Sequence, residues 1–475
     1  MTGRSVGWVS VVATPVLCSP KGSPRDAPLF LAHLPRLARA DADFRLEWGH
    51  PFSSAFLFLR EMSGCLTVDP ARMIAELKQL RELTANSCGA QRVAFTPGWI
   101  RAREFLKEKL SSLPVETHLD AAGNLWSTLA GQSKNSLLIG GHMDSVPDGG
   151  WLDGCLNSLA GLEILRRISR QYGGRPPLTV RLVDWADEEG ARFGKSLFGS
   201  SACAGSLDLA EARGLRDRDG ISLPDALRAV GLDFENVPDS RCELADAAAY
   251  IELHIEQGPV LLDADLTLGS VLGTFGVERH AVSFAGQAAH SGSTPMNRRR
   301  DAFLAAAKMA PEIYRIAERH GGVCTIGSCT TEPGIATSVA AGCRIALDQR
   351  HIEATSLAAM LRDARAAADL FAAEGGVTVS WQRLCQVDPV RFDEELVGLC
   401  DEAILETCGA TLRLPSGPLH DASAIARAGI PAAMMFVQSL HGISHNRIED
   451  TEERHLTDAV RAFDLLASKT LARLA

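Results

Sequence analysis

The chain has 475 residues, of which 46% are hydrophobic and 22% are charged, so it can bury two ordinary domain cores without crosslinks. Its formal net charge of −10 argues against a nucleic-acid or anionic-membrane partner, and no apolar run reaches the roughly 18 residues that cross a bilayer. The 12 cysteines are scattered without a CxxC pair. This pattern predicts reduced thiols and a cytoplasmic protein.

Residues 1–66 differ in character from the rest of the chain. Prolines and isolated aromatic residues occur there without helical or strand periodicity, which predicts a disordered or non-native extension. The first helical pattern is DPARMIAELKQLRELTA, in which Asp69 can cap the helix and Pro70 suits its first turn. Met62 is therefore a candidate start of the natural protein.

Residues 67–275 alternate short apolar runs with amphipathic segments. The runs at 136–140, 178–185 and 248–255 are typical of buried strands, and residues 159–172 carry one apolar helical stripe. Strands that alternate with helices predict an α/β domain with a mixed, partly parallel sheet.

Residues 276–388 have an order of their own, strand, helix, strand, strand, helix, strand, which predicts a ferredoxin-like βαββαβ domain. The α/β pattern resumes over residues 389–475, where 431–438 is another predicted buried strand. The simplest organisation is a catalytic domain in two parts, 67–275 and 389–475, interrupted by an inserted domain.

The first candidate site is GGHMDSVPDGG, directly after the predicted strand 136–140. His142 lies where α/β sheets present ligands, beyond the carboxyl end of a strand. Asp144 can accept the second imidazole N–H and fix the tautomer. Asp153 stands at the start of the next helix, where it can cap the helix or bridge two cations roughly 3.5 Å apart.

Further candidate ligands follow the other predicted strands. Of the adjacent carboxylates Glu188 and Glu189, one can bind a metal while the other holds the attacking water. His254 lies near the end of the strand 248–255. In SLHGISHNRIED, after the strand 431–438, His445 is the preferred ligand and His441 the competing one.

Any one of these motifs has a structural explanation, such as a helix cap, a solvated acidic turn or a packed core histidine. Several strand ends that each offer a ligand make coincidence improbable. Three histidines and two carboxylates without thiolates suit two Zn²⁺, Mn²⁺ or Co²⁺ ions that share a water. Glu188 would deprotonate that water and later protonate the leaving nitrogen.

The segments GHMDSVPDGGWLDG, DEEGARFG, ELHIEQGPVL, GQAAHSGSTPM and GISHNRIEDT resemble the carbamoylase branch of the aminoacylase-like metallopeptidases. That branch contains N-carbamoyl-L-amino-acid hydrolases, allantoate amidohydrolases and β-ureidopropionases, and the resemblance runs from about residue 70 to the end. It implies hydrolysis of a carbamoyl or ureido C–N bond, with release of ammonia and carbon dioxide. It also implies that the inserted domain is a lid through which two copies form a homodimer.

The resemblance also implies roles for individual residues. The implied metal ligands are His142, Asp153, Glu189, His254 and His445. Asp153 would bridge two divalent ions and Glu188 would be the general base. His290 would stabilise the tetrahedral intermediate, reaching the partner subunit's site, while Arg350 would bind the substrate carboxylate and Gln257 would touch the substrate.

Three departures from the family pattern leave the exact substrate open. TSVAAG replaces the usual Asn-Val-Ile-Pro-Gly, so the substrate-binding asparagine falls on Thr337 or Ser338. Asn157 stands where the family commonly has glycine. LPSGPLHDAS replaces Gly-Ala-Gly-His-Asp-Ala but keeps His420 and Asp421, for which we assign no role.

Two other interpretations remain. An N-acyl-amino-acid deacylase or dipeptidase belongs to the same class, but such relatives usually lack the DEEGxRFG and HIEQGP segments. A catalytically inactive metal-binding sensor would belong to a different class. The intact Glu188 argues against it, because an inactive protein gains nothing from a base.

Overall fold

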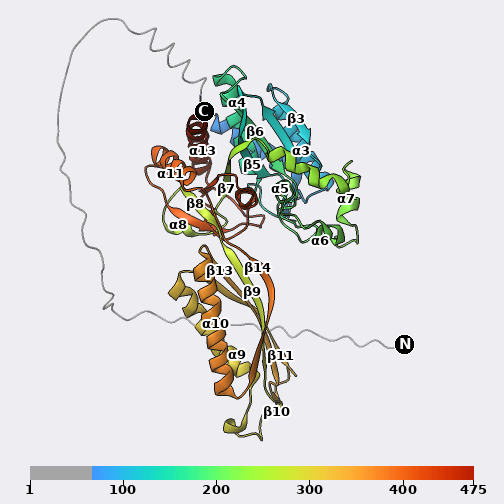
Figure 1. Ribbon diagram of the computed structural model, residues 1–475, viewed down its shortest axis with the longest axis vertical. Helices are drawn as coiled ribbons and strands as arrows, with labels where there is room; N and C mark the ends of the chain where they lie inside the picture. Colours follow the sequence, from blue (N-terminus) through green and yellow to red (C-terminus); the bar gives the residue numbers. More distant parts are fainter. Residues whose placement is uncertain (1–66) are drawn as a thin grey trace, which may run out of the picture. The chain divides into compact units, whose positions relative to one another are not determined.

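The computed structural model describes residues 67–475. The predictions of an extension over residues 1–66 and of a start at Met62 fall outside the described residues. Within the described part, one nine-stranded and one four-stranded β-sheet organise the chain (Figure 1). No helix in this part is long and apolar enough to span a membrane.

The larger sheet is built from both ends of the described sequence. Its strands are β3 (Glu116–Leu119), β4 (Leu125–Leu129), β5 (Ser133–His142), β6 (Leu178–Trp185), β7 (Ala247–Ile255), β8 (Leu268–Thr274), β15 (Val390–Arg391), β16 (Arg413–Ser416) and β17 (Ala432–Val437). Their spatial order is β15-β8-β17-β7-β5-β6-β4-β3, with β16 beside β8. The central strands β17, β7, β5 and β6 run parallel, and the flanking strands β4 and β8 pair antiparallel. The predicted α/β fold with a mixed sheet is confirmed.

Helices cover both faces of this sheet, which explains why its central strands are continuously apolar. On β5, Leu137 and Ile139 join one hydrophobic core, whereas Leu138 joins the core on the opposite face. The first core includes residues of α2 (Pro70–Thr84), α3 (Pro97–Leu110), α4 (Cys155–Gln171), α11 (Glu394–Cys408) and α13 (Glu453–Leu474). The second includes residues of α5 (Phe198–Ala204), α8 (Val260–Asp263) and α12 (Asp421–Arg427).

The start of α2 shows how a local sequence signal sets an element. The Asp69 carboxylate accepts the backbone N–H of Arg72 at 3.1 Å, and Pro70 occupies the first turn. This cap satisfies a donor that the helix itself leaves unpaired. The predicted cap is confirmed.

A smaller connecting region lies between β6 and β7. It consists of α5, α6 (Leu209–Gly214), α7 (Leu223–Ala229) and the 3₁₀ segment Phe234–Leu244. These elements share a core around Phe95, Phe198 and Phe234. Two further short strands, β1 (Ala85–Asn86) and β2 (Gly89–Ala90), form a separate pair.

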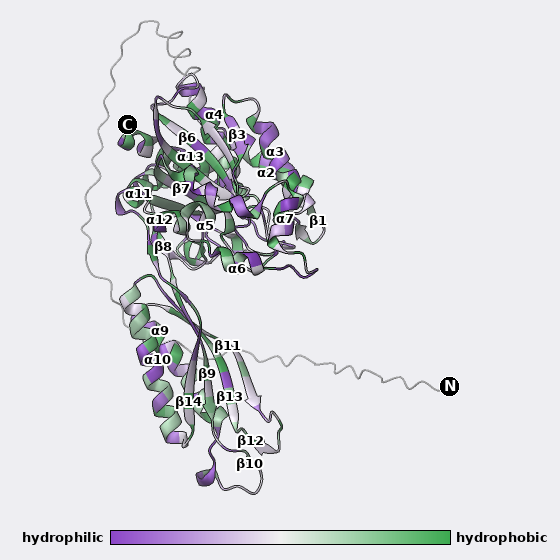
Figure 2. Ribbon diagram, turned by 45° about the vertical axis from the view of Figure 1, so that its right-hand side comes forward, coloured by the Kyte–Doolittle hydropathy of each residue, from purple (hydrophilic) through white to green (hydrophobic). Residues whose placement is uncertain are grey.

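The four-stranded sheet has its own core. Its strands β9 (Gly276–Ala285), β11 (Val323–Glu332), β13 (Gly342–His351) and β14 (Thr378–Val387) are antiparallel in the order β11-β13-β9-β14. Helices α9 (Ala302–His320) and α10 (Ala354–Gly375) pack against it and against each other (Figure 1). Figure 2 shows hydrophilic and hydrophobic residues interleaved along α10, as expected for a helix with one buried face. A short pair, β10 (Ala289–His290) and β12 (Ser338–Val339), lies outside this sheet.

Candidate metal centre

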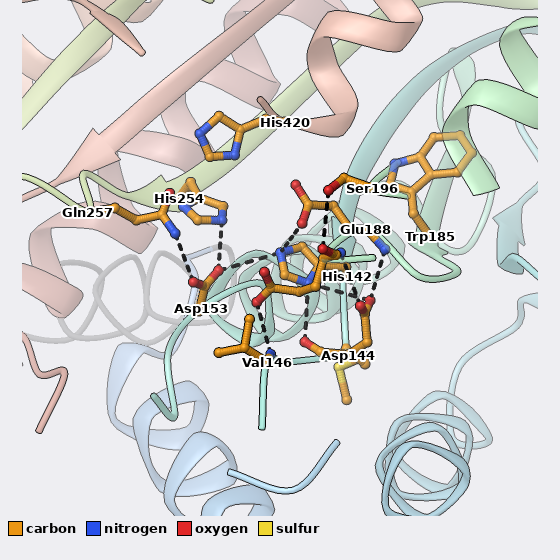
Figure 3. A network of polar contacts seen from close by, with 12 residues as sticks. His142, Asp144, Val146, Asp153, Trp185, Glu188, Ser196, His254, Gln257 and His420 are labelled. Atoms are coloured by element: carbon orange, nitrogen blue, oxygen red, sulfur yellow. Dashed lines mark hydrogen bonds and ion pairs between the residues drawn. The ribbon is translucent and has the colours of Figure 1, made fainter. Parts of the chain in front are cut away.

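Four parallel strands direct polar side chains to one edge of the nine-stranded sheet. His142 is the last residue of β5, and His254 is the penultimate residue of β7. Glu188 and Glu189 follow the end of β6, and His445 follows the end of β17. Because the carboxyl ends of parallel strands meet at the same edge, residues far apart in sequence are brought together here (Figure 3).

One group of side chains consists of His142, Asp153 and His254. Asp153 Oδ1 lies 3.5 Å from His142 Nε2 and 3.1 Å from His254 Nε2. Both imidazoles are buried, and neither Nε2 atom has a hydrogen-bond partner. Burial disfavours the charge of Asp153, but the nearby imidazoles of His142 and His254 hold the pKa of this carboxyl group well below its usual value. Orphaned buried nitrogens that converge on an ionised carboxylate suit a divalent cation.

A second group uses the other oxygen of Asp153. Asp153 Oδ2 lies 3.4 Å from His445 Nε2, which is 3.2 Å from Glu189 Oε2. Burial and the charge of Asp153 raise the pKa of Glu189 to about 7. Asp153 and the two glutamates Glu189 and Glu449 raise the pKa of His445 to about 9, against the effect of burial. Crowded carboxylates of this kind require a proton or a cation as counter-charge.

Asp153 therefore belongs to two neighbouring ligand groups, and in each group the ligand atoms lie within 4.8 Å of one another. This is the arrangement that two cations sharing one carboxylate would need. Imidazole and carboxylate ligands without thiolates fit Zn²⁺, Mn²⁺ or Co²⁺. A third group, formed by Glu252, His254 and His420, also has its ligand atoms within 4.8 Å.

Glu188 lies beside the first group without belonging to it. Its Oε2 is 3.7 Å from His142 Nε2, and its side chain is buried. Burial, together with the charges of Asp421 and Glu189, raises the pKa of Glu188 well above the usual value. The carboxyl group of Glu188 thus lies beside the ligands, in surroundings that disfavour its charge.

Asp144 supports the site differently from the prediction. His142 Nδ1 lies 3.2 Å from the backbone carbonyl of Asp144 and 3.6 Å from its carboxylate. The carboxylate instead accepts the backbone N–H groups of Glu188 and Glu189 at 3.3 and 3.2 Å. Asp144 therefore holds the turn that carries the paired glutamates, with its carboxylate beside the His142 ring.

The loop after β17 places the two candidate histidines differently. His445 joins the second ligand group, whereas His441 lies in the 3₁₀ turn Leu440–Gly442 and in none of the three groups. His445 adopts a positive φ of 53°, an uncommon conformation that is often found at functional sites. Asp187, which directly precedes the paired glutamates, also has a positive φ of 56° and is buried.

Three polar side chains hold Asp153 in place. Glu449 accepts the backbone N–H groups of Leu152 and Asp153 at 3.2 and 3.0 Å. Gln257 Nε2 donates to Asp153 Oδ2 at 2.9 Å, and Ser444 Oγ lies 3.1 Å from the same oxygen. The contacts of Glu449 and Ser444 were not predicted, because nearly 300 residues of chain separate them from Asp153.

His420 packs against the first ligand group. Its ring centroid lies 4.5 Å from that of His254, and both rings are buried (Figure 3). Burial and the charge of His254 hold the pKa of His420 well below the usual value, which favours a neutral imidazole. The neighbouring Asp421 is fully buried at the start of α12.

The predicted substrate residues other than Gln257 lie in the four-stranded region, at two separate positions. His290 pairs with Ser338 across β10 and β12, and the carbonyl of Thr337 accepts the N–H of Ser291 at 3.0 Å. His290 Nδ1 accepts the N–H groups of Gly292 and Ser293, both at 3.1 Å. The Nε2 atom of this exposed ring is therefore the one that carries the proton.

Arg350 lies near the opposite end of β13. Its Nε donates to Asp348 Oδ1 at 2.8 Å, and its Nη1 donates to the carbonyl of Gly417 at 3.1 Å. With Phe275, Pro418 and others it lines a cavity of about 630 Å³. Within β13, Arg350 lies eight residues after Gly342, a length of roughly 27 Å, and Ser338 precedes Gly342 in the separate strand β12.

Residues 138–469 match the model of Peptidase family M20/M25/M40. An N-carbamoyl-L-amino acid amidohydrolase of Geobacillus stearothermophilus is 34% identical over 382 residues, which cover 80% of this chain and 93% of the relative. An allantoate amidohydrolase of Bacillus subtilis is 32% identical, with coverage of 80% and 92%.

Solved structures give a consistent picture. A hydantoinase/carbamoylase family amidase from Burkholderia multivorans superposes with a TM-score of 0.77 at 30% identity, and the match covers 85% of this chain and 98% of that one. A second amidase of that family, from Burkholderia ambifaria, gives 0.77 at 32% identity, with coverage of 85% and 97%.

Proposed function

Because this chain belongs to Peptidase family M20/M25/M40 and is similar to its hydantoinase/carbamoylase amidases, we propose that it hydrolyses an N-carbamoyl-L-amino acid. The family is metal-dependent, and the relatives are named amidohydrolases, which supports a hydrolase of carbon–nitrogen bonds in linear amides rather than in peptides. The products would be the free amino acid, ammonia and carbon dioxide. The observation that carries the proposal is the position of Asp153 in two ligand groups, with Glu188 beside them.

The proposed ligands divide between two cation positions. His142 and His254 would hold the first cation. Glu189 and His445 would hold the second, and Asp153 would contact both. Two such cations, when bound, would lower the pKa of a water toward neutrality and polarise the scissile carbonyl.

Glu188 would supply the acid–base chemistry. Its buried carboxylate, beside His142 but outside both groups, would take a proton from the attacking water. The same carboxyl group would then protonate the nitrogen that leaves. The raised pKa of Glu188 supports this second step, because a carboxyl group must hold its proton until the C–N bond breaks.

The four-stranded region would recognise the rest of the substrate. We assign Arg350 to the substrate carboxylate and the Nε2–H of His290 to the oxygen of the tetrahedral intermediate. These two residues lie toward opposite ends of β13, so one small substrate cannot touch both in a single chain. This separation supports a homodimer in which the partner subunit's His290 completes each site.

A ureido acid such as allantoate is the second candidate substrate. An allantoate amidohydrolase resembles this chain almost as closely as the carbamoyl-amino-acid enzyme does. Thr337 or Ser338 stands where the family carries a substrate-binding asparagine, so a contact that helps to select the substrate differs here. An N-acyl-amino-acid deacylase or dipeptidase is a further alternative.

The test is ammonia release by the purified protein with added Mn²⁺, Co²⁺ or Zn²⁺. The substrates are matched carbamoyl, ureido, acyl and peptidyl derivatives of the same amino acids, and the Glu188→Gln variant is the control. We expect turnover to be fastest on the carbamoyl derivatives. Faster cleavage of the acyl or peptidyl derivatives would contradict the proposal, and inactivity on all substrates would favour the metal-binding sensor.

A further inference from the structure

A buried amide occupies the gap where two ligand-bearing strands separate. β5 and β7 pair in parallel up to Ile139 and Ile251, and the register ends there. Two residues further along, Gly141 and Leu253 would face each other, but the Leu253 N–H instead donates to Oδ1 of Asn157 at 2.8 Å. The side chain of Asn157 thus takes the place of a strand partner.

Asn157 also fills the space beside Gly141. A Cβ atom added to Gly141 would lie 2.5 Å from Asn157 Nδ2 and 2.9 Å from Asn157 Cβ, both far inside contact distance. Asn157 is fully buried, and its Nδ2 atom has no hydrogen-bond partner. A buried donor without a partner lowers the stability of the fold. An apolar side chain could fill the same space without this cost.

The position of Asn157 relates it directly to the ligands. Gly141 immediately precedes His142, Leu253 immediately precedes His254, and Asn157 lies in the first turn of α4, four residues after Asp153. The two imidazole rings are nearly parallel, with centroids 5.9 Å apart and planes inclined by 27°. One side chain therefore ties together the three backbone segments that carry the first ligand group.

We propose that Asn157 is a positioning residue that sets the separation of His142 and His254, and thereby the affinity of the first cation position. The inference rests on the proposed function, whose ligand set it uses. Residue 157 is asparagine in this chain, whereas the family commonly has glycine there. The contact between Asn157 and Leu253 is therefore a feature of this chain. The second position, at Glu189 and His445, does not depend on Asn157.

The test is a titration of the metal-free protein with Co²⁺, followed by the visible absorption of the bound ion and by calorimetry. Asn157→Ala is expected to weaken one of two cobalt equivalents by about 10- to 100-fold, with an altered absorption band, and to leave the other unchanged. Leu165→Ala, a cavity variant in the core of the same helix, is the matched control. It should lower the thermal midpoint without changing the cobalt titration.

Two further variants keep the test decisive if Asn157→Ala fails to fold. Asn157→Asp keeps the acceptor for Leu253 and should lose less affinity than the alanine variant. Gly141→Ala should weaken the same equivalent because its methyl group collides with Asn157.

The outcomes separate this inference from the proposed function. If the parent protein bound no cobalt, the ligand set and this inference would both be wrong. If the parent bound two equivalents and Asn157→Ala matched it in affinity and spectrum, the inference alone would be wrong. It would also be wrong if Gly141→Ala left the affinity of both equivalents unchanged.

Discussion

The edge of the nine-stranded sheet and the four-stranded region place their functional candidates in opposite ways. At the first, parallel strands bring residues as distant as His142 and His445 to a single carboxylate. At the second, Arg350 lies near the end of the ten-residue strand β13, whereas Ser338 lies in the short strand β12, which precedes the start of β13. Parallel strands thus bring functional side chains together at one edge of the sheet. Long antiparallel strands instead keep such side chains apart. We therefore expect residues at this separation to serve one small substrate only if a second subunit supplies one of them.

We expect the largest effect from replacing Asp153, the carboxylate that both ligand groups share at the edge of the nine-stranded sheet. Asp153→Asn removes a charge from both groups, so we expect loss of both metal ions and of all measurable hydrolysis. Metal analysis of the purified variant and an ammonia assay check this. Chelation of the parent should do the same, and Mn²⁺, Co²⁺ or Zn²⁺ should restore it. Full activity in the metal-free parent would contradict the metal centre.

A change beside the ligands should separate binding from chemistry. Glu188→Gln keeps the size and burial of the side chain but removes the base, so kcat should fall by about 10²- to 10⁴-fold with metal content unchanged. Steady-state kinetics with metal analysis on the same sample measures both. Near-parent turnover at full metal occupancy would show that another residue is the base.

The role proposed for His290, in the four-stranded region, can be tested by mixing subunits of two variants. His290→Ala should reduce kcat by about 10²- to 10³-fold, the usual cost of one donor to a developing oxyanion. If His290 acts in the partner subunit's site, exchanging subunits between His290→Ala and Glu188→Gln should restore about a quarter of parent activity, because half of the dimers are mixed and each has one complete site. No recovery after confirmed subunit exchange would place His290 in its own chain's site or outside catalysis.

The smallest of these effects is expected at Arg350. Arg350→Lys keeps the positive charge but loses the planar fork, so kcat/KM should fall by about 30-fold, equivalent to roughly 2 kcal/mol, and Arg350→Ala should lose more. Metal content should not change. Kinetics on the acid and on its uncharged amide check the assignment. Equal losses on both substrates would remove Arg350 from carboxylate recognition.

The sequence by itself determined the elements and the strand ends at which ligands could lie. Periodicity placed β5, β6, β7 and β17, and the cap at Asp69 marked the start of α2. Parallel strands share one edge, so residues after these strands could be expected to meet without knowledge of their contacts. The motifs also identified the family, because each motif is a short continuous segment whose residues carry the chemistry of the site.

Only the tertiary structure decided which side chains touch. It showed that Asp153 joins two ligand groups, that the Asp144 carboxylate holds the glutamate turn, and that Glu449 supports Asp153 from the far end of the chain. It also revealed the amide of Asn157 between two strands. Such contacts depend on strand register and loop conformation, which arise from packing of the whole domain, whereas periodicity and capping act within a few residues.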